Sequence, residues 1–338
     1  MTVERGEPIA VIGGGSWGTA FAAMLAERYG EVSLWVREPD VCSAILSGRE
    51  NRAFLPGVRL PEAVRPTTEL EAALAGRRIV ALAVPSQFLR DVGTRCAPHL
   101  APGATVVSLA KGLESGTLLR MTEVLEQVLP DVRARLAVLS GPTFASEVAR
   151  GIPSGATVAS GDPAVATALQ AAFSGNRFRV YASTDVIGIE IGSALKNVMA
   201  VAAGMSDGLG FGHNARALLI TRGLAEISRV GVRLGADPQT FFGLSGLGDL
   251  VLTCTGDLSR NRMVGMRVGK GERIADILAG MQMVAEGVMT AKAAVDLSRR
   301  SGVAMPISEQ VHLILHEGKN VRTAVTELLS RALRREKD

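Results

Sequence analysis

The feature that most restricts the fold is a glycine-rich turn near the start of the chain. The apolar run Ile9–Ile12 predicts a buried strand, Gly13-Gly14-Gly15-Ser16-Trp17-Gly18 follows at once, and residues 19–29 have helical composition. In this G-x-G-x-x-G motif Gly13 permits a tight turn, Gly15 lets the backbone approach a pyrophosphate, and Gly18 lets the helix pack on its strand. The helix N-terminus also favours an anion. Strand, motif and helix in this order predict a dinucleotide site rather than a turn without a ligand.

Strand and helix signals then alternate along the first half of the chain. Strand candidates lie at 32–36, 79–84, 105–109, 136–139, 155–159 and 178–181, with helical stretches at 69–75, 87–96, 118–128 and 163–173. This alternation predicts a doubly wound, mainly parallel sheet. Such sheets bind ligands beyond the carboxyl ends of their strands. Lys111 stands at one of those ends, where it is either a contact for a phosphate or cofactor carbonyl or an ordinary surface lysine.

Cofactor preference depends on the end of the second strand. An acidic residue there holds the ribose hydroxyls of NAD, whereas an arginine accommodates the 2′-phosphate of NADP. The chain has Arg37 at this place, with Glu38 beside it. Arg37 slightly favours NADP, Glu38 keeps NAD open, and Arg37 could also be a solvated loop cation.

The strand signals stop after residue 185. Helical stretches follow at 190–204, 214–234, 262–268, 288–300, 307–316 and 321–333. A length of 338 residues suits about two domains. We therefore expect a dinucleotide-binding domain of the Rossmann type at 1–183 and an all-α substrate-binding domain at 184–338, sharing a tight interface.

The stretch 190–204 is apolar or small-sided almost all the way round, which is typical of a buried helix. Lys196 lies in its middle, followed by Asn197. A lysine in such a helix must extend its amine to solvent, pair with a carboxylate or face a polar cavity. We predict that this helix joins the two domains and that Lys196 faces the cleft between them.

A segment rich in glycine and hydroxyl side chains lies between the later helices. Leu244-Ser245-Gly246-Leu247-Gly248-Asp249-Leu250 is followed by Thr253-Cys254-Thr255-Gly256 and by Ser259-Arg260-Asn261. An arginine, an amide and backbone N–H groups near a helix start suit a phosphate. Alternatively, Ser259 or Asp257 only caps the helix. Asp249 could pair with Lys196, bind a substrate hydroxyl or cap a helix.

Composition excludes several other classes. The net charge is +4, basic residues are scattered and aromatics are only 4%, so no nucleic-acid-binding surface is expected. Cys42, Cys96 and Cys254 are far apart, which predicts reduced thiols and a cytoplasmic protein. His312 and His316 lack a third ligand, so we expect no metal site. We expect no signal peptide and no apolar span long enough to cross a membrane.

Nine segments together resemble the bacterial NAD(P)-dependent glycerol-3-phosphate dehydrogenases, along almost the whole chain. They are Gly-Gly-Gly-Ser-Trp-Gly-Thr-Ala at 13–20, Val-Pro-Ser at 84–86, Lys-Gly-Leu-Glu at 111–114, Gly-Pro-Thr-Phe-Ala-Ser-Glu at 141–147, Ala-Leu-Lys-Asn-Val at 194–198, Thr-Arg-Gly-Leu-Ala-Glu at 221–226, Gly-Leu-Gly-Asp-Leu at 246–250, Ser-Arg-Asn at 259–261 and Ala-Glu-Gly at 285–287. Phe54, where tyrosine is usual, and His213, where aspartate is common, depart from the family's pattern and put only local loop contacts in doubt.

The resemblance implies a fold like that of 6-phosphogluconate dehydrogenase, reversible reduction of dihydroxyacetone phosphate to sn-glycerol 3-phosphate for phospholipid synthesis, and Lys196 as general acid and base. The implied substrate site comprises Lys111, Gly141, Thr143, Asn197, Asp249, Thr253, Ser259, Arg260 and Asn261. The implied cofactor site comprises Gly13, Gly15, Ser16, Trp17, Gly18, Arg37, Lys111, Ala145, Arg260, Val284 and Glu286. A homodimer is plausible for a half so rich in apolar helices.

Two other functions stay open from the sequence. A related hydroxyacid dehydrogenase also pairs this fold with a catalytic lysine, although Ser259-Arg260-Asn261 speaks against it. A non-catalytic nucleotide sensor would keep the fold without the chemistry. A sensor needs no proton acceptor, so the presence of Lys196 with Asn197 and Asp249 disfavours it.

Overall fold

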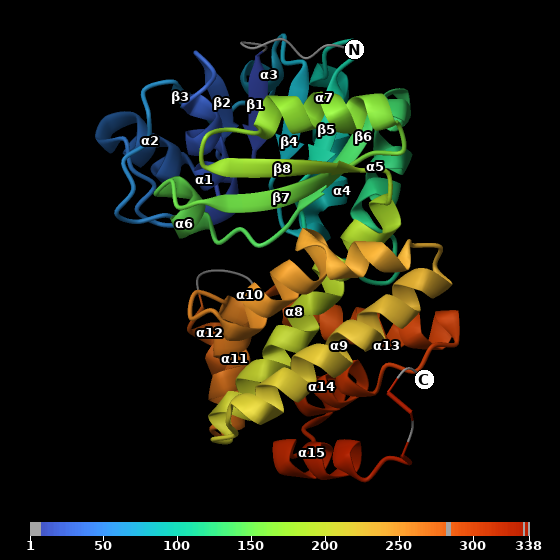
Figure 1. The fold of residues 1–338 in the computed structure, drawn as a ribbon. Helices are drawn as coiled ribbons and strands as arrows, with labels where there is room; N and C mark the ends of the chain where they lie inside the picture. The colour runs from blue at the N-terminus through green and yellow to red at the C-terminus, as the bar shows by residue number, and fades with distance from the viewer. Residues whose placement is uncertain (1–7, 282–284, 334, 337–338) are drawn as a thin grey trace.

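The computed structural model describes residues 8–281, 285–333 and 335–336. Figure 1 shows a sheet domain with helices on both faces, and a helical domain beneath it. The chain passes from one to the other once, through the long helix α8 (Val186–Gly208).

The sheet has eight strands among the described residues, in the order β3-β2-β1-β4-β5-β6-β7-β8. They are β1 (Ile9–Ile12), β2 (Val32–Trp35), β3 (Val64–Thr67), β4 (Ile79–Leu82), β5 (Thr105–Ser108), β6 (Leu136–Ser140), β7 (Ser154–Ala159) and β8 (Phe178–Ser183). Neighbouring strands pair in parallel except β6 and β7. The predicted doubly wound, mainly parallel sheet is confirmed. Its order reverses between β1 and β4, where ligands bind such sheets.

The sequence did not predict β3. This strand reads Val64-Arg65-Pro66-Thr67 and forms one edge of the sheet. A proline cannot donate to a strand ladder, so it argues against a strand from sequence but is tolerated at an edge. Only the pairing of β3 with β2 identifies it.

The strands β1, β2, β4, β5 and β6 are buried on both faces, which explains why they are apolar runs without alternation, whereas the edge strands β3 and β8 alternate between buried and exposed residues. Ile9 and Val11 of β1 belong to one apolar cluster, whereas Ala10 and Ile12 belong to another on the opposite face. The helices of this domain are α1 (Ser16–Ala26), α2 (Pro39–Gly48), α3 (Leu70–Leu74), α4 (Leu89–Cys96), α5 (Met121–Val128), α6 (Ala145–Ala149) and α7 (Pro163–Phe173).

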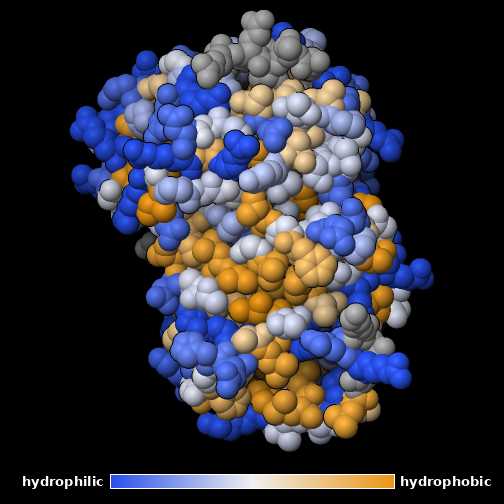
Figure 2. Space-filling model, in the orientation of Figure 1, coloured by the Kyte–Doolittle hydropathy of each residue, from blue (hydrophilic) through white to orange (hydrophobic). Residues whose placement is uncertain are grey.

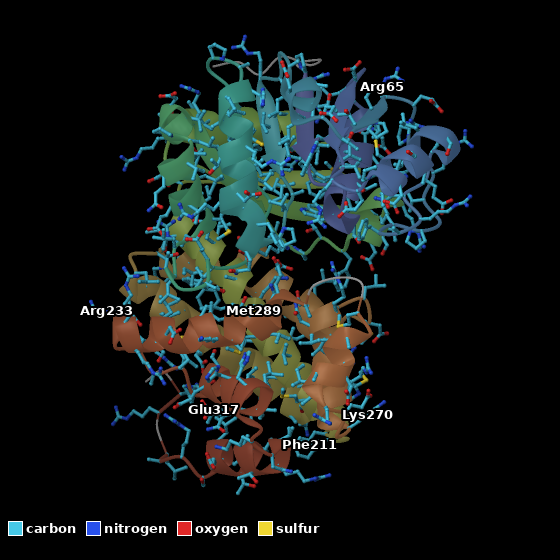
Figure 3. The ribbon with its side chains drawn as sticks, turned by 180° about the vertical axis from the view of Figure 1, so that it is seen from behind. Arg65, Phe211, Arg233, Lys270, Met289 and Glu317 are labelled. Carbon is cyan, nitrogen blue, oxygen red and sulfur yellow. The ribbon has the colours of Figure 1, made fainter. Side chains whose placement is uncertain are left out.

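The helical domain surrounds α8, which is buried from Gly188 to Ser206. Its other helices are α9 (His213–Arg233), α10 (Asp249–Thr255), α11 (Arg260–Gly269), α12 (Ile274–Ala279), α13 (Glu286–Ser301), α14 (Pro306–Glu317) and α15 (Val321–Leu329). Seen from behind in Figure 3, α13, which carries Met289, runs across this domain next to the sheet domain. The sequence did not predict α10, because the glycines at 246 and 248 hid a short π-helical turn, Leu244–Gly248, that leads into it.

Glycines allow α8 and α11 to cross in backbone contact. A Cβ on Gly204 would lie 1.9 Å from the carbonyl oxygen of Arg262, and one on Gly265 would lie 2.0 Å from that of Val201. Larger residues would force the helices apart. The crossing holds the start of α11, with Arg260 and Asn261, beside the middle of α8.

Helix α8 also corrects one sequence-based expectation. With 23 residues it is long and apolar enough to cross a membrane by length and composition, although no such span was expected. However, 89% of its most apolar window is buried inside the protein. Its apolar composition therefore reflects its place at the centre of the helical domain.

Candidate active site

The glycine-rich turn has the geometry that its sequence predicts. Gly13 has a φ of +124°, and a Cβ there would lie 2.4 Å from the carbonyl oxygen of Ala83. A Cβ on Gly18 would lie 2.0 Å from the carbonyl oxygen of Gly13. Nothing lies within 4 Å of a Cβ on Gly15, just before the N-terminus of α1. Two glycines serve packing and the third faces open space, as a pyrophosphate site requires.

The two residues after Gly15 lie at the first turn of α1. The hydroxyl of Ser16 donates to the backbone carbonyl of Phe54, so this contact uses no atom of the Phe54 side chain. The indole N–H of Trp17 is buried and has no partner among the described residues. Buried donors normally find a partner, so this N–H is an exception among the described residues.

Arg37 lies at the end of β2, where the ribose of a dinucleotide is expected. Its guanidinium donates to Glu38 through Nε, at 2.9 Å, and Nη2, at 2.6 Å. The Arg37 side chain is 67% exposed. It is therefore free to turn towards a phosphate at the cost of an exposed ion pair, which stabilises little.

The centre of the site is one carboxylate shared by two lysines. Asp249, at the start of α10, accepts from Lys196 through Oδ1 and from Lys111 through Oδ2, both at 2.8 Å. Lys196 is 5% exposed and also donates to Thr253 Oγ1 at 2.7 Å. Of the alternatives for Asp249, the structure selects the pairing with Lys196. It also brings Lys111, from the sheet domain, to the same carboxylate.

Burial is the largest influence on the pKa values of Lys196 and Asp249. It lowers the pKa of Lys196 to about 8; Asp249 opposes this shift and Lys111 adds to it. Burial by itself would raise the pKa of Asp249, but Lys111 and Lys196 outweigh it and hold that pKa below its usual value. Lys196 can therefore gain and lose a proton near neutral pH, which general acid–base catalysis requires.

A second set of polar groups lies beside Lys196. Asn261 donates to the Asn197 side-chain oxygen at 3.0 Å and accepts from the Gly287 N–H at 3.0 Å. A Cβ on Gly287 would lie 2.5 Å from the carbonyl oxygen of Asn197. The predicted site did not include Gly287. In the sequence this glycine stood out only as part of the family segment Ala285-Glu286-Gly287, because no local pattern places it beside Asn197.

Arg260 and Glu286 are partly buried ionisable side chains next to this set. Burial lowers the pKa of Arg260, opposed by Glu286, and raises the pKa of Glu286. Glu286 also accepts from the backbone N–H of Ser86 at 3.3 Å. Like Gly287, Ser86, which follows β4, contacts the site but was not among the predicted site residues. Ser259 accepts from the N–H of Arg262 at 3.3 Å, so it caps α11 as the alternative for that residue supposed.

Gly141 and Thr143, two of the predicted substrate-site residues, lie beside Lys111. The Gly141 carbonyl accepts from Lys111 Nζ and from the Thr143 hydroxyl, both at 3.1 Å. A Cβ on Gly141 would lie 2.7 Å from the Cα of Ala156, so only glycine fits there. Ala145 begins α6. Val284 lies outside the described residues.

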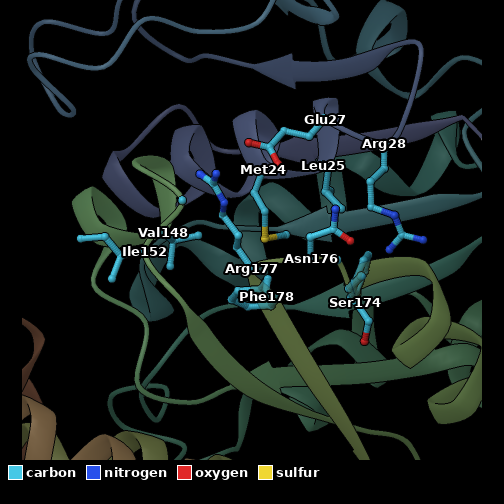
Figure 4. A pocket seen from close by; sticks show the side chains of 13 residues that line it. Met24, Leu25, Glu27, Arg28, Val148, Ile152, Ser174, Asn176, Arg177 and Phe178 are labelled. Atoms are coloured by element: carbon cyan, nitrogen blue, oxygen red, sulfur yellow. The ribbon is translucent and has the colours of Figure 1, made fainter.

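Other candidate features lie away from this site. The hollow in Figure 4, about 460 Å³, lies between the end of α1 and the turn from α7 to β8 and shares no residue with the site. Beside it, Arg28 donates to the carbonyls of Ala171 and Ala172. His316 contacts the Val288 carbonyl at 3.0 Å. Within the described ranges no three His, Cys, Asp or Glu side chains could hold a metal.

Three features define the class of protein: a glycine-rich turn suited to a dinucleotide, Lys111 at a strand end, and the buried Lys196 with a pKa of about 8. Together they define a two-domain nicotinamide-dependent dehydrogenase. The family described as NAD-dependent glycerol-3-phosphate dehydrogenase matches with its N-terminal part at residues 8–166 and its C-terminal part at 185–326. The chain belongs to this family, and the resemblance seen in the sequence is confirmed.

Individual relatives over almost the whole chain have the same family name. Glycerol-3-phosphate dehydrogenase [NAD(P)+] of Geobacter sulfurreducens is 54% identical over 98% of this chain and 99% of its own. That of Myxococcus xanthus is 54% identical over 95% and 96%. The crystal structure of glycerol-3-phosphate dehydrogenase from Coxiella burnetii has a TM-score of 0.91 at 38% identity and covers 96% of this chain and 99% of its own.

Proposed function

We propose that this protein reversibly reduces dihydroxyacetone phosphate to sn-glycerol 3-phosphate with NADPH or NADH. The observation that carries the proposal is the buried Lys196, with a pKa of about 8, bound to a carboxylate that Lys111 shares. Its relatives, each named glycerol-3-phosphate dehydrogenase [NAD(P)+], support the choice of substrate.

In the proposed mechanism the ammonium form of Lys196 donates a proton to the C2 oxygen during reduction, and its neutral form accepts that proton during oxidation. The nicotinamide, when bound, supplies or accepts the hydride at C2. Asp249 and Thr253 hold two protons of the ammonium group, which leaves the third for the substrate oxygen. Lys111 would stabilise negative charge on that oxygen or on the phosphate.

The phosphate would bind at the start of α11. Arg260 offers a planar pair of donors, and Asn261 and Asn197 offer side-chain amides beside it. Holding the phosphate there would use binding energy to orient C2 against Lys196. Thr143 and the Gly141 backbone would contact the other end of this small substrate.

For the cofactor we propose the turn at Gly13, Gly15 and Gly18 for the pyrophosphate, with Ser16 and Trp17 beside it. The open space at Gly15 supports this placement. Glu286, Ala145 and Val284 are further proposed contacts of the cofactor. Arg37 gives a slight preference for NADP, against which its ion pair with Glu38 must open.

We further propose that residues 1–183 form the cofactor domain and residues 184–338 the substrate domain. A homodimer is the proposed assembly, because exposed apolar side chains form a band over α9 and α10 (Figure 2). Leu218, Val232, Phe242 and Val251 contribute to it. Sedimentation equilibrium tests this assembly, and a monomer at micromolar concentration would contradict it.

We place the protein in the cytoplasm, where its product would supply phospholipid synthesis. Cys42, Cys96 and Cys254 are buried free thiols, which suits a reducing compartment. Localisation of a tagged chain in cells tests the compartment. Incorporation of labelled glycerol phosphate into lipid, with and without the protein, tests the metabolic role.

The reaction itself is tested by mixing the protein with dihydroxyacetone phosphate and NADPH or NADH and following nicotinamide absorbance. Loss of absorbance is expected with at least one cofactor, and the ratio of the two rates measures the preference. Cofactor binding without turnover would contradict the proposal.

The proton donor is tested with Lys196→Ala. Turnover should fall by roughly 10²–10⁴-fold, the usual contribution of a general acid. Cofactor affinity, measured by fluorescence titration, should stay that of the parent. Near-normal turnover would show that another group transfers the proton.

A further inference from the structure

Glu190 is a buried carboxylate on α8 that takes no part in the site described above. Its side chain is 2% exposed. Oε1 accepts from the Thr122 N–H at 2.8 Å, and Oε2 accepts from the Thr122 hydroxyl at 2.6 Å and from Arg120 Nη1 at 2.7 Å. Thr122 lies in the first turn of α5. A residue of the helix that carries Lys196 thus closes the N-terminus of a helix in the sheet domain.

Arg120 extends this contact towards Lys111. The segment between β5 and α5 begins near Lys111 and ends at Arg120, and it folds back on itself. Leu113 and Arg120 form an isolated antiparallel bridge, and the Glu114 N–H donates to the Leu119 carbonyl at 3.0 Å. The backbone two residues after Lys111 is therefore fixed to the residue that Glu190 holds.

Two routes lead from Glu190 to the same carboxylate. Glu190 and Lys196 lie on the same helix, α8, which holds them at a fixed separation. Glu190 is also linked to Lys111, through its contact with Arg120 and the bridge between Arg120 and Leu113. Both lysines end on Asp249. We propose that Glu190 is a positioning residue that keeps Lys111 and Lys196 in register across the two domains. This inference rests on the proposed dehydrogenase function.

The contact requires a carboxylate. Three donors point at the two oxygens of Glu190, and a glutamine offers one acceptor oxygen and a donor amide in their place. A buried donor would then lose its partner, and the bridge at Arg120 would loosen. A displacement of about 1 Å in a group near the reaction can cost roughly 10²-fold in rate.

Glu226 provides a matched control. It is 1% exposed, and it accepts from the N–H groups of Ile307 and Ser308 and from the Ser308 hydroxyl at 2.7–3.0 Å. It closes the N-terminus of α14 as Glu190 closes that of α5. Both ends of the Glu226 contact lie within the helical domain. It therefore offers a buried carboxylate with three donors at a helix N-terminus, with backbone and hydroxyl donors in place of the Arg120 guanidinium and without the link to Lys111.

The test compares Glu190→Gln with Glu226→Gln in the full chain, by thermal unfolding and by the pH dependence of kcat/KM for dihydroxyacetone phosphate. Both variants should unfold at a lower temperature. Only Glu190→Gln should lose roughly 10–100-fold in kcat/KM, and the pH at which its reductive activity declines should rise, because Lys111 no longer lies beside Lys196.

Parental kcat/KM and pH dependence in Glu190→Gln would overturn the inference, as would equal changes in Glu226→Gln. If Glu190→Gln does not fold, Thr122→Val removes one of the three donors and is read in the same way, with a smaller loss expected. A parent protein that binds cofactor but does not turn over would overturn the proposed function, and this inference with it. A parent that turns over with an unaltered Glu190→Gln would overturn only the inference.

Discussion

The charge of Asp249 should set the pH range in which the enzyme reduces its substrate. Asp249→Asn keeps the size of the side chain but removes the anion 2.8 Å from Lys196. Asp249 raises the pKa of Lys196, whereas burial and Lys111 lower it. Without the anion that pKa should fall below its present value of about 8.

The size of the effect follows from the charge separation. Two unit charges about 4 Å apart interact by about 4 kcal/mol at an effective dielectric constant of 20. One pKa unit corresponds to about 1.4 kcal/mol, so an interaction of this size is equivalent to a shift of roughly three units. Water that enters near the altered side chain would reduce it, and we expect a fall of at least about one unit.

The assay is kcat/KM for dihydroxyacetone phosphate against pH at saturating NADPH, which reports the ionisation of the enzyme before this substrate binds. Reduction needs the ammonium form of Lys196, so activity should be present below the pKa and decline as pH rises through it. In Asp249→Asn the decline should move to lower pH. Lys111→Met removes a neighbouring cation and should move it to higher pH. A shift of both variants in one direction, or of neither, would refute this account of Lys196.

Three further predictions concern glycines and the cofactor. Gly15→Ala should fold normally, because its Cβ meets open space, but should weaken NADPH binding in a fluorescence titration. Gly18→Ala should lose stability instead, because its Cβ would lie 2.0 Å from a carbonyl oxygen. Equal melting temperatures of the two variants would contradict this contrast. Gly265→Ala should lower the free energy of unfolding by about 1–3 kcal/mol or more by overpacking the crossing of α8 and α11, which urea titration measures. Arg37→Gln should reduce kcat/KM at least about tenfold for NADPH and little for NADH; an unchanged ratio would show that Arg37 does not meet the 2′-phosphate.

Local patterns in the sequence were sufficient for most of the fold. Apolar runs marked the strands that are buried on both faces, and the G-x-G-x-x-G turn placed β1 correctly and predicted a helix after it, although α1 spans Ser16–Ala26 rather than 19–29. These features are local, because a strand, a tight turn and a helix start each depend on a few adjacent residues. Where a residue's role came from a partner far along the chain, the local signal failed. The edge strand β3 was not predicted because it contains Pro66, and α10 was not predicted because Gly246 lies in the turn that leads into it.

The sequence also showed that Lys196 needs a partner, because a lysine in an apolar helix cannot stay unsatisfied. It offered Asp249 as one possible partner but could not choose among the alternatives, since Lys196 and Asp249 lie on separate helices of the helical domain and Lys111 reaches them from the sheet domain. Tertiary packing also decides that Glu190 closes α5 across the domain interface while Glu226 closes α14 within the helical domain, although both are acidic residues in helical stretches. Residue type determined which groups had to be paired, and tertiary structure alone decided with what, because those contacts join residues that no local pattern connects.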